Sequence, residues 1–303
     1  MSDIASVITQ NILPILLVAS FGYALRRWRE PDPRVLSSVV LNVFSPALVF
    51  SSLVQSDIPG AELLELSLFT LLVLAAMGLL GWVASRMLRL SRMETAALVI
   101  VVMFVNSGNF GLTLANLRYG QEGLSRAVVY YATSTPLIYT LGVFIASMGV
   151  VTWREAGRRM LRLPAVYATV AAIIVYAFHI PVPQPLMSAI AIAGSGAIPV
   201  MLLVLGMQLA ELRGDLNLRL AAPAVGMRLL IGPLVGIAIA GLLGLQGLSR
   251  STGIIQASMP TAVFTIILAT EFSLPVGAVT SIVVFSTLLS PLTVAVTISL
   301  VGL

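Results

Sequence analysis

The stretch that decides the fold is Val105-Asn106-Ser107-Gly108-Asn109-Phe110-Gly111, within an otherwise apolar segment from about residue 95 to residue 117. Asparagine and serine side chains compete for backbone hydrogen bonds, and glycine adds backbone entropy, so this run is a poor helix interior. At bilayer depth every freed backbone N–H and C=O needs a partner, so an interrupted helix persists there only against protein or a wet cavity. The stretch therefore predicts a broken membrane helix that lines a cavity.

A second apolar segment, about residues 249–272, carries a similar interruption at Ser258-Met259-Pro260-Thr261. Its proline removes a helical hydrogen bond and clashes with the preceding turn. Two interrupted spans in corresponding positions of two halves of a chain are the best sequence indication of a transporter's binding site. We therefore expect the two breaks to meet near the middle of the membrane around a wet pocket.

The composition predicts a membrane protein. Of the 303 residues, 58% are hydrophobic and only 10% are charged, too few to cover the surface of a soluble domain. Apolar stretches of about twenty residues recur along the chain. They predict an all-α polytopic protein with ten transmembrane helices, at about 4–25, 35–55, 63–88, 95–117, 125–150, 164–180, 185–210, 219–245, 249–272 and 275–300.

The arginines indicate the orientation of these spans. Thirteen lie in the loops after spans 1, 3, 5 and 7, and three lie in the opposite loops. The positive-inside rule then makes both termini non-cytoplasmic and residues 151–163 a cytoplasmic linker, in a multi-pass protein of a cell membrane, most simply a bacterial inner membrane. Because these arginines sit in short loops and not on one polar face, the net charge of +5 does not indicate nucleic-acid binding.

Internal spacing divides the chain into two halves. Three pairs of features are each separated by 153 to 155 residues: Pro46 and Pro199, Pro136 and Pro291, and the breaks at Asn106 and Pro260. Two halves of five spans must cross the membrane in opposite directions, as inverted repeats do. The sequence thus predicts a first five-helix repeat in residues 1–150 and a second in residues 164–303.

Several stretches resemble the auxin efflux carrier family, in the expected order and over nearly the whole chain. They are Asn42–Phe50 in span 2, Asn106–Leu112 with Tyr119–Gly123 in and after span 4, Arg162–Ala168 at the start of span 6, Pro199–Met207 in span 7 and Ser258–Pro260 in span 9. The short length and compact middle loop are similar to the prokaryotic members, and not to the plant carriers with long central loops.

This resemblance implies a scaffold of spans 1, 2, 6 and 7 and a transport domain of spans 3–5 and 8–10, in which the broken spans 4 and 9 cross. It implies export or exchange of small organic anions, carboxylates such as malonate, with auxin-like acids as a more distant possibility. It also implies an elevator-like or rocking motion of one bundle against the other, and a homodimer formed through the scaffold.

The chemistry of the breaks predicts where an anion binds. A half-helix that starts after a break presents free N–H groups and about half a positive charge. We expect such starts near Gly108 and, after Pro260, near Thr261. We predict that Asn106, Asn109, the Gly108 backbone and Thr261 hold a carboxylate, with Pro260 also part of the substrate site. In the alternative interpretation, the two asparagines only cap broken helices and touch no ligand.

Four further polar residues within spans are candidates for the same site. Asn42 and Ser45 in span 2 are predicted to line the scaffold side, and Gln208 and Gln256 to line the pocket or take part in gating. Each is equally well explained by a hydrogen bond between helices.

Two charged residues have open roles. Arg228, the only arginine well inside a span, either pairs with the substrate carboxylate, closes the inner gate, or extends to the membrane interface. Glu271 is either a proton-coupling site or an interfacial residue that ends span 9. No acidic residue occupies the middle of a predicted span, so coupling could use Glu271, a sodium ion held by neutral oxygens, or only the membrane potential.

These observations predict a secondary active transporter of small organic anions in the lipid bilayer, without a metal or organic cofactor. The alternatives are a sodium-coupled symporter similar to the bile acid symporters, and an anion channel. Enzyme motifs such as His-Glu-x-x-His are absent from the sequence, so we expect no enzymatic activity.

Overall fold

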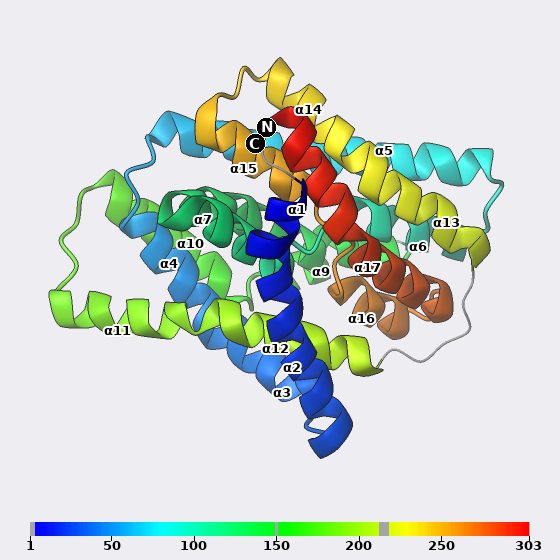
Figure 1. Cartoon of the computed structure of the whole chain (residues 1–303), viewed down its shortest axis with the longest axis horizontal. Coiled ribbons are helices and arrows are strands. Elements are labelled where there is room, and N and C mark those ends of the chain that lie inside the picture. Colours follow the sequence, from blue (N-terminus) through cyan, green and yellow to red (C-terminus); the bar gives the residue numbers. More distant parts are fainter. Residues whose placement is uncertain (1–3, 149–150, 212–217, 303) are drawn as a thin grey trace.

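The computed structural model describes residues 4–148, 151–211 and 218–302, which are almost entirely helical (Figure 1). Residue 150, the end of the first predicted repeat, and Arg213, one of the arginines used to assign orientation, lie outside the described residues. The segments labelled η are π-helical and mostly continue an α-helix.

The described part of the first half of the chain contains twelve helical elements. They are α1 (Ile4–Val7), η1 (Ile8–Ile12), α2 (Leu13–Arg29), α3 (Pro33–Val39), η2 (Val40–Phe44), α4 (Ser45–Val54), α5 (Gly60–Met87), α6 (Arg92–Met103), η3 (Ser107–Leu112), α7 (Thr113–Leu137), η4 (Ile138–Gly142) and α8 (Val143–Ala146).

The described part of the second half contains ten. They are α9 (Trp153–Met160), α10 (Pro164–Ala177), α11 (Gln184–Ser195), α12 (Ala197–Glu211), α13 (Leu218–Gly226), η5 (Met227–Ile231), α14 (Gly232–Leu242), α15 (Gly247–Ala257), α16 (Phe264–Glu271) and α17 (Val276–Val301).

Seven helical segments in the described ranges are long and apolar enough to cross a membrane. They are Ile4–Arg29, Pro33–Val54, Gly60–Met87, Ser107–Ala146, Gln184–Glu211, Leu220–Leu242 and Val276–Val301. An eighth candidate, Arg154–Met160 with Pro164–Ala177, is bent by 69°. The predicted spans 95–117 and 249–272 do not add to this number because their breaks leave pieces too short to span alone. The chain is thus a multi-pass helical membrane protein.

Local sequence signals explain two helix starts beside arginine-rich loops. The Asp32 side chain accepts the Arg34 amide at 2.8 Å, with proline at the first position of α3, where no intrahelical N–H is needed. At the start of α6, Ser91 and Glu94 cap each other: the Glu94 amide donates to Ser91 Oγ at 3.3 Å and the Ser91 amide to Glu94 Oε2 at 2.9 Å.

The predicted fourth and fifth spans are joined by a single residue. Inside α7, Gly120 has φ 63° and ψ −155°, a conformation that only glycine adopts without strain. The chain therefore changes direction at Gly120 without a loop.

Helix α12 crosses α2 at close range (Figure 1). A Cβ atom at Gly22 would overlap the Leu203 carbonyl, and one at Gly206 would overlap the Ala19 carbonyl. Small residues that allow backbones to approach are the usual means of helix association in membranes. This contact joins the two halves of the chain.

The helices pack in two groups. In one, α2 and α3 pack against α12, α11 packs against α12 and α4, and α4 also packs against α10. In the other, α5 packs against α6, α7, α14 and α15, α15 also packs against α7 and α14, and α17 packs against α13 and α16. The broken segments belong to the second group, and η3 contacts α12 of the first.

Both predicted breaks are present, with boundaries that differ from those expected. The first comprises Phe104–Asn106 and not 105–111, because the chain is wound again, as a π-helix, from Ser107. The two glycines lie within this π-helix, and neighbours pack where their side chains would be: the Tyr131 ring lies over Gly108 and Gln256 over Gly111. The second break extends from residue 258 to residue 263.

Candidate functional site

The two breaks lie side by side and complete each other's backbone hydrogen bonds. Val105 and Thr261 form an antiparallel bridge. In it, the Asn106 amide donates to the Pro260 carbonyl at 2.8 Å, and the Ala262 amide donates to the Phe104 carbonyl at 3.0 Å. This exchange satisfies groups that hydrocarbon could not, which allows non-helical backbone at this place.

The carbonyl ends of α6 and α15 share one arginine. Arg228, on η5, donates from Nη1 to the Val102 carbonyl at 2.7 Å and from Nη2 to the Ala257 carbonyl. Its side chain is fully buried, and a Cβ at Gly232, one turn later, would collide with the guanidinium. Because the last carbonyls of a helix carry partial negative charge, a buried cation between two such ends is electrostatically favourable.

The helical segments that follow the two breaks begin beside a cavity. Helix η3 begins at Ser107, after Asn106, and α16 begins at Phe264, after Val263. The first amides of a helix have no intrahelical carbonyl partner. The residues at both starts line a cavity of about 170 Å³.

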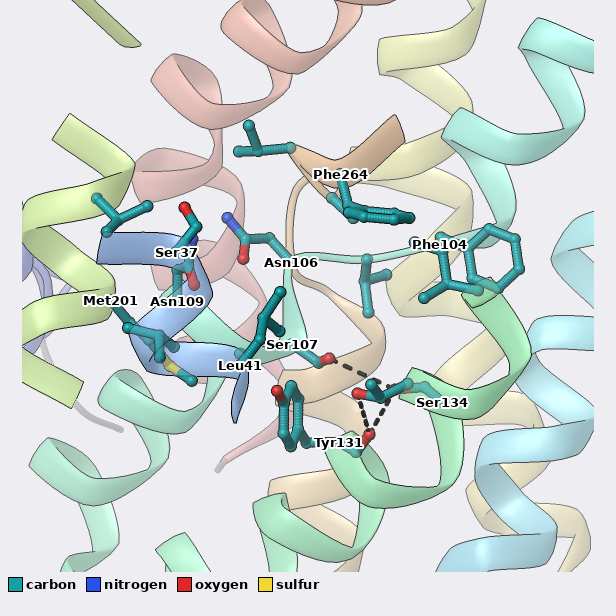
Figure 2. A pocket seen from close by; sticks show the side chains of 18 of the residues that line it. Ser37, Leu41, Phe104, Asn106, Ser107, Asn109, Tyr131, Ser134, Met201 and Phe264 are labelled. Atoms are coloured by element: carbon teal, nitrogen blue, oxygen red, sulfur yellow. Dashed lines mark hydrogen bonds between the residues drawn. The ribbon is translucent and has the colours of Figure 1, made fainter. Parts of the chain in front are cut away.

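The wall of this cavity is mixed apolar and neutral polar (Figure 2). Its polar side chains are Ser37, Asn106, Ser107, Asn109, Tyr131, Ser134, Thr135, Tyr139 and Gln208, and its remaining residues are apolar or Gly108. No charged side chain is among the described residues that line it. The cavity therefore offers neutral hydrogen-bonding groups and the amide ends of helices.

A hydrogen-bonded cluster fixes one side of the cavity. Ser107 Oγ lies 3.5 Å from Ser134 Oγ, and Ser134 Oγ donates to the Tyr131 carbonyl at 3.2 Å (Figure 2). Behind it, the Tyr131 and Ser45 hydroxyls share a hydrogen bond of 2.7 Å. The Tyr131 ring is thus held between η3, α7 and α4.

The other side has polar atoms without a protein partner. Asn106 is 6% exposed, and its Nδ2 atom makes no hydrogen bond; the same holds for Gln208 Oε1 on α12. Buried amide groups usually bind protein or an ordered ligand. Figure 2 shows Asn106 on the same side of the pocket as Asn109 and Ser37.

The structure brings four of the predicted site residues to this cavity: Asn106, Gly108, Asn109 and Gln208. Pro260 and Thr261 do not line it. Thr261 is fully buried, its hydroxyl donates to the Val101 carbonyl at 2.9 Å, and its amide donates to Ser286 Oγ at 3.2 Å. The reason is that α16 starts three residues after Thr261, so that Ala262 and Val263 reach the cavity instead.

Three further predicted residues lie outside the wall. Asn42 is exposed on the protein surface and donates to the Ser38 carbonyl at 2.8 Å, while Ser45 lies behind Tyr131. Gln256 is fully buried against Gly111, with no hydrogen-bond partner for either amide atom.

The two charged candidates are engaged elsewhere. Arg228 is neither at the cavity wall nor extended to the interface, because both of its terminal nitrogens bind carbonyls. Glu271 pairs with Arg159 of α9 at 2.7 Å, with its side chain 43% exposed. This position agrees with an interfacial end of α16 and separates Glu271 from the cavity.

Sequence reasoning missed the contribution of span 5. Tyr131, Ser134 and Thr135 line the cavity, yet only Pro136 was singled out in that span. The run Tyr130-Tyr131-Ala132-Thr133-Ser134-Thr135 is polar within an apolar span, and this was the available signal.

Comparison with known proteins identifies the family. The profile described as "Membrane transport protein" matches residues 7–149 and 148–298. An uncharacterized transporter of Methanothermobacter thermautotrophicus is 29% identical over 93% of this chain and 94% of its own length, and one of Methanocaldococcus jannaschii is 21% identical over 94% of each. A probable auxin efflux carrier component 3b of Oryza sativa is 25% identical over 49% of this chain and 26% of its own length. The chain therefore belongs to the membrane transport protein family, which includes the auxin efflux carriers.

Proposed function

We propose that this transporter carries small organic anions, with the carboxylate bound at the amide ends of η3 and α16. The observation that carries the proposal is the separation of charge around the breaks. Both carbonyl ends are neutralised by Arg228, and both amide ends border a cavity with no charged side chain in its described wall. Helix amide ends favour anions.

The cavity's dimensions and polar groups support a small substrate. A volume of about 170 Å³ suits a short carboxylic acid such as malonate better than a bulky amphiphile. Asn106 Nδ2 is a buried donor without a partner, and Asn109 lies one helical turn away. The apolar wall, which includes Phe264 and Met201, would contact the carbon skeleton.

We further propose that transport is by alternating access between the two packing groups. The group of α2, α3, α4, α10, α11 and α12 would be the scaffold, and the group with the two breaks would move. The cavity lies between them, since Ser37 and Met201 belong to the first group and Asn106 and Phe264 to the second. The predicted inverted repeat of two five-helix halves, with both termini outside the cytoplasm, fits this division.

The test is uptake of radiolabelled mono- and dicarboxylates into proteoliposomes, with counterflow to distinguish a carrier from a channel. Asn106→Ala and Asn109→Ala should each lower uptake by about tenfold or more, because a hydrogen bond to a charged group contributes about 1.5–3 kcal/mol. Asn42→Ala is the matched control, since this asparagine lies outside the cavity, and should transport as the wild type does.

Equal uptake by the three variants, each with wild-type thermal stability, would remove the asparagines from the mechanism. Uptake of neutral compounds in preference to anions would refute the substrate class. Repeating the assay with and without a sodium gradient separates this proposal from a sodium-coupled symporter.

A further inference from the structure

A second hollow lies on the outside of the helix bundle, away from the candidate site. It is a groove of about 420 Å³ between α5, α6 and the segment η4–α8. Its wall is almost entirely apolar, and Leu79 and Trp82 on its α5 side are 60% and 52% exposed. Such residues face the hydrocarbon of a bilayer, so the groove opens toward lipid.

Small side chains create the groove. Ala75 and Gly78 on α5 and Ala96 on α6 lie in its wall, and these residues leave space that larger ones would fill. A Cβ at Gly78 would lie 3.1 Å from Met103 Sδ, so Met103 forms part of the floor. From Arg92 to Met103 the groove follows α6 for about 16 Å at 1.5 Å per residue, a length that suits an extended hydrocarbon chain.

The mouth of the groove is basic. Arg92 lies in its wall and donates one hydrogen bond, from Nη2 to the Met148 carbonyl at 2.6 Å, which holds the guanidinium in place. Arg86, in the last turn of α5, and Arg89, on the short connection from α5 to α6, are also exposed. Trp82 stands near this end of α5, where aromatic side chains commonly sit at the membrane interface.

We propose that this groove binds one anionic phospholipid, with an acyl chain along α6 and the phosphate at Arg92. An apolar channel open to the bilayer with a basic end matches a lipid with an apolar tail and a negative head, and polybasic segments near a membrane surface attract anionic lipids. A second copy of the chain is a poorer occupant, because a two-fold contact here would bring the same arginines together.

The proposal can be tested by fluorescence quenching, since Trp82 lines the groove. A protein with Trp28→Phe and Trp153→Phe retains Trp82 as its only tryptophan, and is placed in phosphatidylcholine bilayers. Phosphatidylglycerol with brominated acyl chains should quench Trp82 with an apparent association constant about fivefold above that of brominated phosphatidylcholine, the effect of one arginine near the surface.

Two pairs of variants make the test specific. Arg92→Gln should abolish the preference for phosphatidylglycerol, whereas Arg29→Gln, at the end of α2, should retain it. Ala75→Phe should fill the groove and lower quenching by phosphatidylglycerol to the phosphatidylcholine level, whereas Leu72→Phe, on α5 but outside the groove, should not.

The outcomes are distinct. Equal quenching by the two lipids, equal loss in Arg92→Gln and Arg29→Gln, or unchanged quenching in a folded Ala75→Phe protein would each overturn the proposal. Protection of Trp82 from both lipids, lost when the protein is diluted in the bilayer, would show that a second copy covers the groove instead.

Discussion

The carbonyl ends and the amide ends of the broken helices have different surroundings. The carbonyl ends of α6 and α15 converge on one buried arginine, Arg228, which belongs to the chain. The amide ends of η3 and α16 border a cavity in whose described wall there is no acidic side chain. The protein supplies its own cation for the carbonyl ends, and in the proposed function a substrate anion binds at the amide ends. This difference teaches that a fixed charge can stabilise the broken helices while the proposed transport uses the charge of the substrate.

Removing the arginine should have the largest effect. Arg228→Met leaves the Val102 and Ala257 carbonyls without this partner, at about 1–3 kcal/mol for each unsatisfied buried group. We expect a loss of about 3–5 kcal/mol in the free energy of unfolding, measured by thermal or denaturant unfolding in detergent. Arg228→Lys, which keeps the charge but lacks the second arm, should fall between.

Arg29→Gln, which changes an exposed arginine, serves as the control and should unfold as the wild type does. A folded Arg228→Met protein with wild-type stability and normal transport would mean that the carbonyl ends need no cation. The carbonyl ends would then not differ from the amide ends in requiring a charged partner from the chain.

Binding of a carboxylate at the amide ends of η3 and α16 should stabilise the protein. A carboxylate at a hundred times its dissociation constant adds about 2.7 kcal/mol to the folded state. Asn109→Ala, with about tenfold weaker binding, should lose about 1.4 kcal/mol of that gain, while Asn42→Ala should keep it. Differential scanning fluorimetry across a carboxylate series measures this directly; identical shifts in both variants would place the anion elsewhere.

Gly111 and Gln256 form a contact between the two broken helices, because Gly111 lies on η3, after the first break, and Gln256 lies on α15, before the second. A methyl group at Gly111 would overlap the Gln256 amide, so Gly111→Ala should cost about 1–3 kcal/mol by overpacking. Adding Gln256→Ala should relieve most of this loss. Gly241→Ala, where a Cβ meets open space, is the matched control, and lack of rescue in the double variant would argue against direct contact.

The smallest effect is expected where α16 ends at the surface. The Arg159–Glu271 pair is 34% and 43% exposed, and pairs of this kind contribute up to about 1 kcal/mol. Arg159→Gln should therefore lower the melting temperature slightly, and by less in high salt. A loss as large as that of Arg228→Met would show that exposure does not distinguish the two arginines.

The sequence predicted the breaks because they leave a local signal: amides, glycines and a proline within apolar spans. It did not predict the partners of Arg228. They are main-chain carbonyls of Val102 and Ala257, two apolar residues whose side chains carry no information about the contact. A buried arginine alone cannot reveal whether its partner is a ligand, a carboxylate or the backbone.

The candidate site was predicted in part for a related reason. Asn106 and Asn109 belong to the break itself, so local sequence found them. Tyr131 and Ser134 come from another span and reach the cavity only through packing against Gly108 and Ser107. Thr261 was misplaced because the start of a helix depends on tertiary contacts, and here the bridge to Val105 delays it to Phe264.

The bridge between the breaks also constrains how the protein is made. The Asn106 amide, the Phe104 carbonyl and the Val102 carbonyl find their partners at Pro260, Ala262 and Arg228, all more than 120 positions later in the chain. When the ribosome has released only the first half, that half holds polar backbone groups that lipid cannot satisfy. The hydrogen bonds between the two breaks can therefore form only near the end of translation. Until then, water or the insertion machinery must provide hydrogen-bond partners for the backbone groups of the first break.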